Sequence, residues 1–412
     1  DTIITLNVDE GVPYETKIVF VGATYAEKAL AKFTIPVESD YTLKQGSGAS
    51  QDYLVLAPQS YQVVDKNGTI RYITESLKDA IDKANTHKAS YGEQLMVVVN
   101  EKEVVLDESV QIGVENNNSS DKDNVYIAAR KSTTISRSGF GSYALNIGRY
   151  ANVFIGTNCM PEGFSVDFVD LTTGRLPTIT FIGEIISSDN VTEVDGFIRN
   201  AGMLTLGENV ILEHNVLKTN SPGVVKDGGA VVVTNGGTLV VCGSVFNDNR
   251  AIGSGGAIYV ENGSTLEFKS GEIENNRATV SGGGILIDNS TATISGGQIS
   301  HNIANYLGGG IAVRNGGSLT ISGNVTISNN EASNGGGISL FGKGEVITKS
   351  SPEGGRVQIT SNIASYSGGG VFAASTPETI DGKSSIMAEL KIFGADINGN
   401  AAQKFGGGIC LT

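Results

Sequence analysis

The sequence predicts an all-β chain wound into a right-handed parallel β-helix, a solenoid with three faces. The first observation is a repeat, because a Gly-Gly pair followed by Ala or Gly and then an aliphatic residue recurs along the C-terminal half. The pair starts at Gly228, Gly255, Gly282, Gly308, Gly335, Gly368 and Gly406, with spacings of 27, 27, 26, 27, 33 and 38 residues. The second is three short strand-like pieces in each repeat, as expected for one coil stacked ~4.8 Å from the next. Right-handedness follows from the crossover preference of parallel strands.

The composition supports this fold and excludes several functions. The 412 residues include 55 glycines and only 8 prolines, which suits a fold with many tight corners. The formal net charge of −14 disfavours nucleic acids as partners. No apolar run approaches the ~18 residues of a membrane span, so we expect no membrane insertion by this chain.

A column of asparagines accompanies the glycine pairs. Most of these asparagines lie six residues before a pair, and an alanine follows two residues after most of them. Stacked coils would bring the side-chain amides together as a hydrogen-bonded ladder at one corner. The predicted structural ladder consists of Asn215, Asn249, Asn276, Asn302, Asn330, Asn362 and Asn400.

The first strand of each coil predicts a binding surface. Ile258 and Val260 belong to two columns that face inward, so the column between them should face outward. That column contains apolar residues, and an exposed apolar stripe typically marks an interaction site. The candidate binding residues are Val232, Tyr259, Leu286 and Phe372.

The organisation along the chain follows from changes in pattern. In residues 1–60, apolar and polar residues alternate in strand-like segments, so we expect a small β-sandwich-like unit there. Residues 61–412 are expected to form the β-helix. Within the β-helix region we expect a capping helix at about 73–88, with Thr74 as N-cap. Irregular coils are expected at about 95–196 and regular repeats at about 197–412.

The three cysteines predict no disulfide. Cys242 and Cys410 lie six coils apart, which at ~4.8 Å per coil is about 29 Å. A disulfide requires Cα atoms within ~7 Å. Cys159 lies several irregular coils before Cys242.

A search for chemistry gives no catalytic residues, no metal site and no cofactor. Polysaccharide cleavage needs paired carboxylates, or clustered acids with a basic residue, and the outward carboxylates Glu213, Glu274 and Asp396 lie on separate coils. Asn-x-Ser/Thr triplets provide candidate N-glycosylation sites. They begin at Asn67, Asn117, Asn118, Asn190, Asn262, Asn289 and Asn324.

The repeat resembles that of the chlamydial polymorphic outer-membrane proteins, which carry Gly-Gly-Ala-aliphatic and Phe-x-x-Asn motifs. Gly255-Gly-Ala-Ile and Gly228-Gly-Ala-Val match the first motif, and Phe246-Asn-Asp-Asn249 matches the second. Most other coils depart to Gly-Gly-Gly-Ile and Ile-x-x-Asn, and the similarity covers about 197–412. Relaxed repeats of this kind are similar to those of adhesin-like surface proteins. The resemblance implies a secreted or surface-displayed stalk that is often adhesive.

The sequence therefore predicts a non-catalytic extracellular protein, secreted or at the cell surface, that serves as an adhesive or structural stalk. The alternative is a polysaccharide-active or glycan-binding β-helix that uses residues 112–200 and loops near Tyr366 and Phe372. Expected partners are a host or neighbouring-cell surface protein or glycan, or other copies of the same polypeptide. Ile409 and Leu411 near the last residue favour either a longer native polypeptide or head-to-tail stacking into a filament.

Overall fold

The polypeptide folds as two units in a computed structural model. The first unit comprises Asp1–Glu101 with Ser165–Asp167, and the second comprises Lys102–Phe164 with Phe168–Thr412. The structure describes residues 4–6, 17–20, 33–34, 41–45, 50, 53–58, 60–65, 70–91, 95–113, 123–138, 140–156, 177–185, 193–350, 354–375, 378–380, 383–385 and 388–412. The expected boundary after residue 60 stays a prediction.

Short sheets and one helix make up the described part of the first unit. β1 (Ile4–Thr5) pairs in parallel with β3 (Phe33–Thr34). β2 (Lys17–Phe20), β5 (Tyr53–Pro58) and β4 (Tyr41–Gln45) form an antiparallel sheet. β6 (Tyr61–Val64) pairs antiparallel with both β7 (Ile70–Thr74) and β8 (Met96–Val99). The strands expected in this region are therefore present. Their expected arrangement as a small β-sandwich stays a prediction.

The expected helix is α2, which spans Leu77–Tyr91. It starts later than predicted because Ser76 is the N-cap: its Oγ accepts a hydrogen bond from Asp79 N at 3.0 Å, whereas Thr74 ends strand β7. Leu77, Ala80, Ile81 and Ala84 are buried against β6, β7 and β8. Whether α2 covers the first coil stays a prediction.

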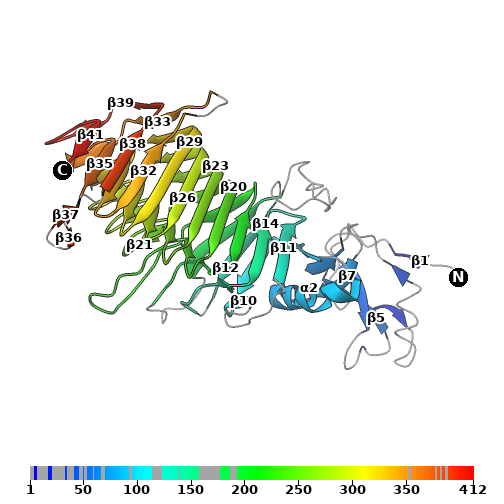
Figure 1. The fold of residues 1–412 in the computed structure, drawn as a ribbon. Coiled ribbons are helices and arrows are strands. Elements are labelled where there is room, and N and C mark those ends of the chain that lie inside the picture. The colour runs from blue at the N-terminus through cyan, green and yellow to red at the C-terminus, as the bar shows by residue number, and fades with distance from the viewer. Residues whose placement is uncertain are drawn as a thin grey trace. The chain divides into compact units, whose positions relative to one another are not determined.

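The second unit is a right-handed parallel β-helix, as predicted from the repeat. Figure 1 shows its strands stacked coil upon coil, from cyan at β11 to red at β39. Each complete coil from Val231 onward contributes to three parallel sheets. A small antiparallel hairpin of β36 (Glu378–Ile380) and β37 (Lys383–Ser385) stands apart from them.

The strands of the three sheets are as follows. The first sheet, of ten strands, contains β10 (Val110–Ile112), β13 (Leu145–Ile147), β16 (Ile198–Asn200), β19 (Val231–Val233), β22 (Ile258–Val260), β25 (Ile285–Asp288), β28 (Ile311–Arg314), β31 (Ile338–Phe341), β35 (Val371–Ala374) and β41 (Ile409–Leu411). The second sheet contains β9 (Glu103–Leu106), β11 (Asp123–Ala129), β12 (Thr133–Arg137), β14 (Ala151–Ile155), β15 (Ile179–Ile185), β17 (Met203–Leu206), β18 (Val210–Glu213), β20 (Thr238–Asn247), β23 (Thr265–Glu274), β26 (Thr291–Ser300), β29 (Gly317–Ser328), β32 (Gly344–Thr348), β33 (Val357–Thr360), β38 (Ala388–Ile392) and β39 (Ala395–Asn398). The third sheet, of six strands, contains β21 (Arg250–Ala251), β24 (Arg277–Ala278), β27 (Ile303–Ala304), β30 (Glu331–Asn334), β34 (Ile363–Ser367) and β40 (Ala401–Ala402).

The division of a coil into strands differs in detail from the expectation. The second and third pieces, expected as separate strands, form one long strand in β20, β23, β26 and β29. The ladder between β20 and β23 shifts register at Cys242, so the long strand bends at a β-bulge there. The third face is instead the short strand that follows the ladder asparagine, where a corner was expected.

The interior of the coil is filled by the predicted inward columns. Ile258, Ile285, Ile311, Ile338 and Val371 align through the ten-stranded sheet and are at most 1% exposed. Phe246 and Phe268 are fully buried on the facing second sheet. Ile409 shares the first column but is 39% exposed in the last coil.

The asparagine column forms a continuous ladder inside the corner. Asn276 Nδ2 donates to Asn302 Oδ1 at 2.9 Å, and the backbone N of Asn276 donates to the same oxygen at 3.0 Å. The other hydrogen of Asn276 Nδ2 goes to the carbonyl of Phe246 at 3.0 Å, so each amide joins neighbouring coils. The same side-chain bonds link Asn215, Asn249, Asn276, Asn302, Asn330, Asn362 and Asn400 in order.

No described helix is long and apolar enough to cross a membrane.

We predict that Asn302→Ala destabilises the β-helix strongly. The substitution removes the acceptor of two buried donors, Asn276 N and Nδ2, and a buried donor left without a partner costs about 1–3 kcal/mol. The loss should appear as a lower midpoint in urea unfolding followed by circular dichroism. Asn305→Ala, at an exposed position of the same coil, is the matched control. Equal midpoints for the two variants would contradict a stabilising ladder.

Candidate functional site

The predicted binding stripe has the expected register but is not an exposed surface. Val232 pairs with Tyr259 and Tyr259 with Leu286, and Phe372 lies in the same column of the ten-stranded sheet. The exposed fractions are 5% for Val232, 8% for Tyr259, 0% for Leu286 and 8% for Phe372. Val232, Tyr259 and Leu286 form an apolar cluster with Ala312, and Tyr143 packs against it. The expectation of an exposed apolar stripe was therefore wrong.

The glycine pair that marks the repeat explains this burial. Gly255 has φ +66°, a left-handed conformation that reverses the backbone just before β22. A Cβ on Gly255 would lie 2.5 Å from the carbonyl oxygen of Ile258 and 3.0 Å from Cβ of Tyr259. The backbone of each glycine turn thus folds over the outward column, at a distance that no larger residue would allow.

Polar side chains flank the covered stripe and define a second candidate surface. Asp288 lies at its centre: its Oδ2 accepts hydrogen bonds from Arg314 Nε at 2.8 Å and Tyr259 OH at 3.4 Å. Its Oδ1 accepts from Asn315 Nδ2 at 2.7 Å. On the preceding coils, Thr234 Oγ1 donates to Glu261 at 2.8 Å.

We call the whole set the polar strip; its members lie on successive coils of the ten-stranded sheet and its edges. They are Tyr143, Asp195, Lys226, Asp227, Thr234, Tyr259, Glu261, Asp288, Arg314 and Asn315.

Burial and neighbouring acids shift the pKa values within the polar strip. Burial, with a smaller contribution from Asp195, raises the pKa of Tyr143 to about 12. Burial and the charge of Asp288 raise the pKa of Tyr259 above its ordinary value. Burial also raises the pKa of Asp227, although its carboxylate accepts a hydrogen bond from Ser254 N at 2.5 Å. Both tyrosines therefore remain hydrogen-bond donors at neutral pH.

An ion-pair network anchors the N-terminal end of the strip. Lys226 Nζ lies 2.5 Å from Asp195 Oδ1 and 3.3 Å from Glu193 Oε2. The fully buried Arg137 donates to the backbone carbonyls of Asp195 and Ser142, at 2.8 and 3.0 Å. Burial lowers the pKa of Arg137 to about 10, so it stays charged at neutral pH and fixes the connections that carry Asp195 and Tyr143.

The strip was missed in the sequence, although a signal was present. Thr234, Glu261, Asp288 and Arg314 each follow directly after the second inward residue of the first strand, as Glu261 follows Val260. They occupy the next outward column. The polar residues at this position in four successive coils were the signal that could have identified the strip.

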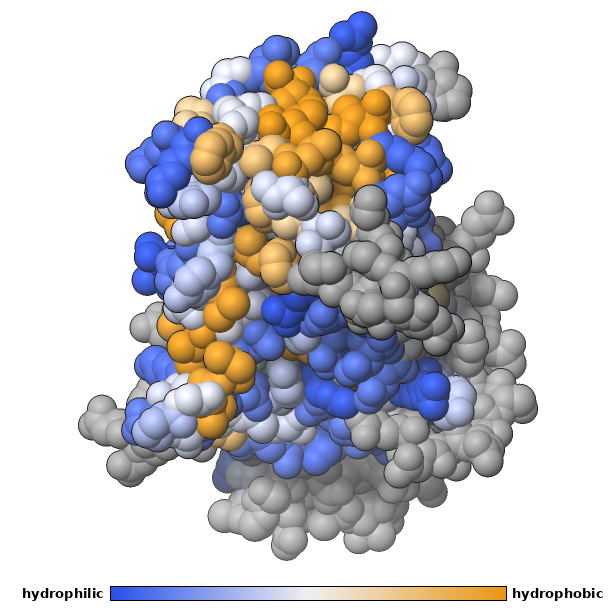
Figure 2. All heavy atoms as spheres, turned by 60° about the vertical axis from the view of Figure 1, so that its left-hand side comes forward, coloured by the Kyte–Doolittle hydropathy of each residue, from blue (hydrophilic) through white to orange (hydrophobic). Residues whose placement is uncertain are grey.

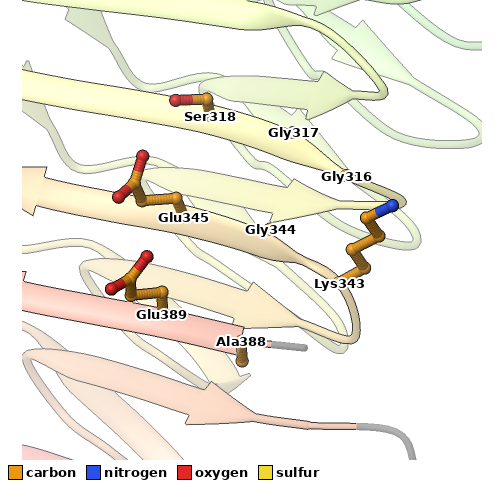
Figure 3. A pocket seen from close by; sticks show the side chains of 8 residues that line it. All are labelled: Gly316, Gly317, Ser318, Lys343, Gly344, Glu345, Ala388 and Glu389. Atoms are coloured by element: carbon orange, nitrogen blue, oxygen red, sulfur yellow. The ribbon is translucent and has the colours of Figure 1, made fainter. Parts of the chain in front are cut away.

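A shallow pocket lies where the backbone passes from the ten-stranded to the second sheet. Gly316, Gly317 and Gly344 form its floor, because they carry no side chains to fill it. Figure 3 shows Ser318, Glu345 and Glu389 in a row on neighbouring strands, with Lys343 at the corner. Glu345 and Glu389 are the kind of carboxylate pair that glycoside hydrolases use for acid–base catalysis.

That pair does not have the properties of a hydrolytic site. Lys391 Nζ lies 2.7 Å from Glu389 Oε1 and 3.2 Å from Glu345 Oε1. The hydrogen bond from Lys391 lowers the pKa of Glu389. A glycosidic general acid needs the opposite shift, so Glu389 is unsuited to that role.

Exposed hydrophobic side chains gather on the C-terminal coils. Figure 2 shows them as an orange area in the upper part of the view. Tyr366 is 45% exposed and Phe405 58%, with ring centroids 6.1 Å apart, and Lys404 Nζ lies 4.2 Å from the centroid of the Tyr366 ring. Of the two residues named for the glycan-binding alternative, Tyr366 is thus accessible and Phe372 is covered.

Three of the candidate glycosylation sites fall within the described residues. Asn262 and Asn289 are exposed at corners of the coil, and Asn324 is exposed within strand β29. Asn67, Asn117, Asn118 and Asn190 lie outside the described residues. Glycosylation itself stays a prediction. In the described ranges, no three His, Cys, Asp or Glu side chains are grouped so that they could hold a metal ion.

The absence of a disulfide was predicted wrongly. Cys242 is disulfide-bonded, whereas Cys410 is a free, buried thiol. The argument from coil spacing holds only for cysteines that both lie in stacked coils, such as Cys242 and Cys410. Cys159 falls between β14 and β15, in a connection far longer than a coil corner, and lies outside the described residues.

We predict that Gly255→Ala destabilises the protein more than Gly263→Ala. Both glycines have left-handed φ values, +66° and +73°, which cost an L-residue about 1–2 kcal/mol. A Cβ on Gly263 has no neighbour within 4 Å, whereas one on Gly255 collides with Ile258 and Tyr259. Thermal unfolding of both variants measures the difference. If the two variants were equally stable, the Gly255 turn would not be in close contact with the covered apolar stripe.

Thiol counting tests the disulfide. The protein has three cysteines, so one disulfide leaves one free thiol in protein denatured without reductant. After reduction the count should rise to three. A removed disulfide typically costs 2–4 kcal/mol, so reductant should also lower the unfolding midpoint. Three free thiols before reduction would refute the bond.

Comparison with known proteins supports the fold. Residues 229–412 match the family model described as the right handed beta helix region. No curated protein and no solved structure gives a significant match. Domains of the matched family occur both in adhesin-like and in polysaccharide-active proteins. The protein thus has a β-helix repeat region, and its resemblance to the polymorphic outer-membrane proteins stays a prediction.

Proposed function

We propose that this protein is a non-catalytic extracellular adhesive β-helix that binds a cell-surface glycan or protein along the polar strip. The observation that carries the proposal is the arrangement of the strip, with one or more polar groups on each of several consecutive coils. Asp288, Arg314 and Glu261 are all partly exposed there. Groups spaced ~4.8 Å apart along a solenoid can contact successive units of an extended ligand.

The chemistry of the strip suits a hydroxyl-rich or charged ligand. The arginine and asparagine side chains of the strip donate hydrogen bonds, and Asp288 and Glu261 accept them. Their mutual bonds hold the side chains in place before a ligand arrives, which reduces the entropy lost on binding. The covered apolar stripe lies beside them, two residues earlier in the same strands, and its packing keeps those strands rigid.

Secretion or surface display is proposed on separate grounds. Disulfides form and persist mainly in oxidising compartments, and Cys242 is disulfide-bonded. The exposed triplets at Asn262, Asn289 and Asn324 are compatible with a secreted protein. A stalk or filament role, with copies stacked head to tail, stays a prediction without an observation of its own.

A polysaccharide-active β-helix is the second candidate, and Asp227 favours it. Its pKa is raised by burial, which is the property of a general acid, and its charge acts on Tyr259 together with that of Asp288. In this candidate the partly buried Asp227 acts as the acid and a more exposed carboxylate of the strip acts as the base. Turnover of any polysaccharide that Asp227→Asn abolishes would establish this candidate over the first.

For the adhesive function we predict that Asp288→Asn weakens ligand binding at least about tenfold, or ~1.4 kcal/mol. The substitution weakens the bonds to Arg314, Tyr259 and Asn315 that order the strip. The measurement is binding to glycan and surface-protein arrays, followed by titration of the best ligand.

Asp396→Asn is the matched control, because Asp396 pairs with Arg356 at 3.1 Å on the second sheet, away from the strip. It should leave affinity unchanged. Equal affinities for both variants, with unfolding midpoints like the wild type, would place the ligand elsewhere and reject the strip.

A further inference from the structure

Three Asn-Gly turns of nearly the same shape connect the ten-stranded sheet to the second sheet. They are Asn235–Gly236, Asn262–Gly263 and Asn315–Gly316. The asparagines have φ of +54°, +55° and +54°, and the glycines have φ of +79°, +73° and +89°. All three asparagines are exposed. The turns therefore form a matched set within one molecule.

The set differs in the bonds that hold each turn. Gly263 N donates to the carbonyl of Asn289 at 2.9 Å, and Gly316 N donates to that of Lys343 at 2.7 Å. No such bond joins Gly236 N to the following coil or to any other described residue.

The asparagine side chains of the three turns also differ in whether they are hydrogen-bonded. Asn315 Nδ2 donates to Asp288 at 2.7 Å, and Asn262 Nδ2 lies 3.5 Å from Thr234 Oγ1. The Asn235 amide group makes no hydrogen bond with a described residue. The glycine N–H and the asparagine side-chain amide are therefore both hydrogen-bonded in the turns at Asn262 and Asn315. In the turn at Asn235 neither group bonds a described residue.

We propose that Asn235 is a site of spontaneous covalent modification, converting to an aspartyl or isoaspartyl residue. The backbone nitrogen of Gly236 attacks Cγ of Asn235 and forms a new bond to that carbon. The bond between Cγ and Nδ2 breaks, and ammonia leaves with the amide proton. The product is a five-membered succinimide. Solvent water then adds to one of its two carbonyls, which opens the ring without any oxidant or reductant.

Among the three matched turns, freedom of the Gly236 amide selects Asn235, because the attacking nitrogen must lose its proton and turn toward Cγ. At the other two turns the same movement first breaks a bond between coils. Asn334–Gly335 is held in this way too, since Gly335 N donates to Ser367 O at 3.0 Å. The sequence Asn-Gly alone would not separate these positions.

The modification would alter the polar strip. Asn235 follows Thr234, whose hydroxyl donates to Glu261. A new carboxylate at position 235 adds negative charge at that end of the strip, and an isoaspartyl link lengthens the backbone of the turn by one carbon. Ageing of the protein outside the cell would thus change the charge of the surface proposed to bind ligand.

Peptide mapping by mass spectrometry tests the proposal on full-length protein made in cells that do not add N-glycans. The protein is held in mildly alkaline buffer, and conversion of Asn235, Asn262 and Asn315 is followed over time. We expect Asn235 to react faster by roughly two- to tenfold, the factor that one net hydrogen bond represents. The same incubation in concentrated urea should bring the three rates together, because the turns are then lost.

Asn235→Ser should also remove the acidic species that accumulates on ion exchange. If that variant does not fold, the wild-type map alone still decides. Native rates at Asn262 or Asn315 equal to that at Asn235 would overturn the proposal. So would a rate advantage for Asn235 that persists in urea, since sequence and not structure would then select the site.

Discussion

The hydrogen bond between an asparagine side chain and the next coil is the interaction on which the regular part of this structure depends. A parallel β-helix must place backbone groups of its corners inside the coil, where water cannot satisfy them. The ladder from Asn215 to Asn400 supplies those bonds, with each Nδ2 serving both the next Oδ1 and a carbonyl of the preceding coil. Because every rung aligns the next, insertions at other corners leave the stacking intact, as between Asn330 and Asn362.

The glycine turn is the second constraint, and it decides which surface remains for function. Its backbone folds onto the outward column of the first strand and so removes Tyr259 and Phe372 from solvent. The next outward column remains partly accessible, and Glu261, Asp288 and Arg314 lie there beside the covered stripe. The turn therefore removes the apolar stripe from solvent and leaves the neighbouring polar column as the accessible one.

The two functional candidates make different use of the same strip. Adhesion needs only that ordered donors and acceptors be presented along several coils, which the bonds around Asp288 achieve. Catalysis would need Asp227 as a general acid beside a second carboxylate. The burial that raises the pKa of Asp227 is the observation that supports this role. Glu345 and Glu389 both pair with Lys391, and this pair of carboxylates favours neither candidate.

The sequence by itself determined the β-helix, the register of its columns and the asparagine ladder. These follow from periodicity, since residues one coil apart must stack, and Ile258, Ile285 and Ile311 align as their spacing requires. Only the tertiary structure decided which columns are exposed, because exposure depends on how closely the Gly255 backbone approaches Tyr259. It also decided the state of Cys242 and the freedom of Gly236 N, since both depend on contacts that coil spacing does not specify.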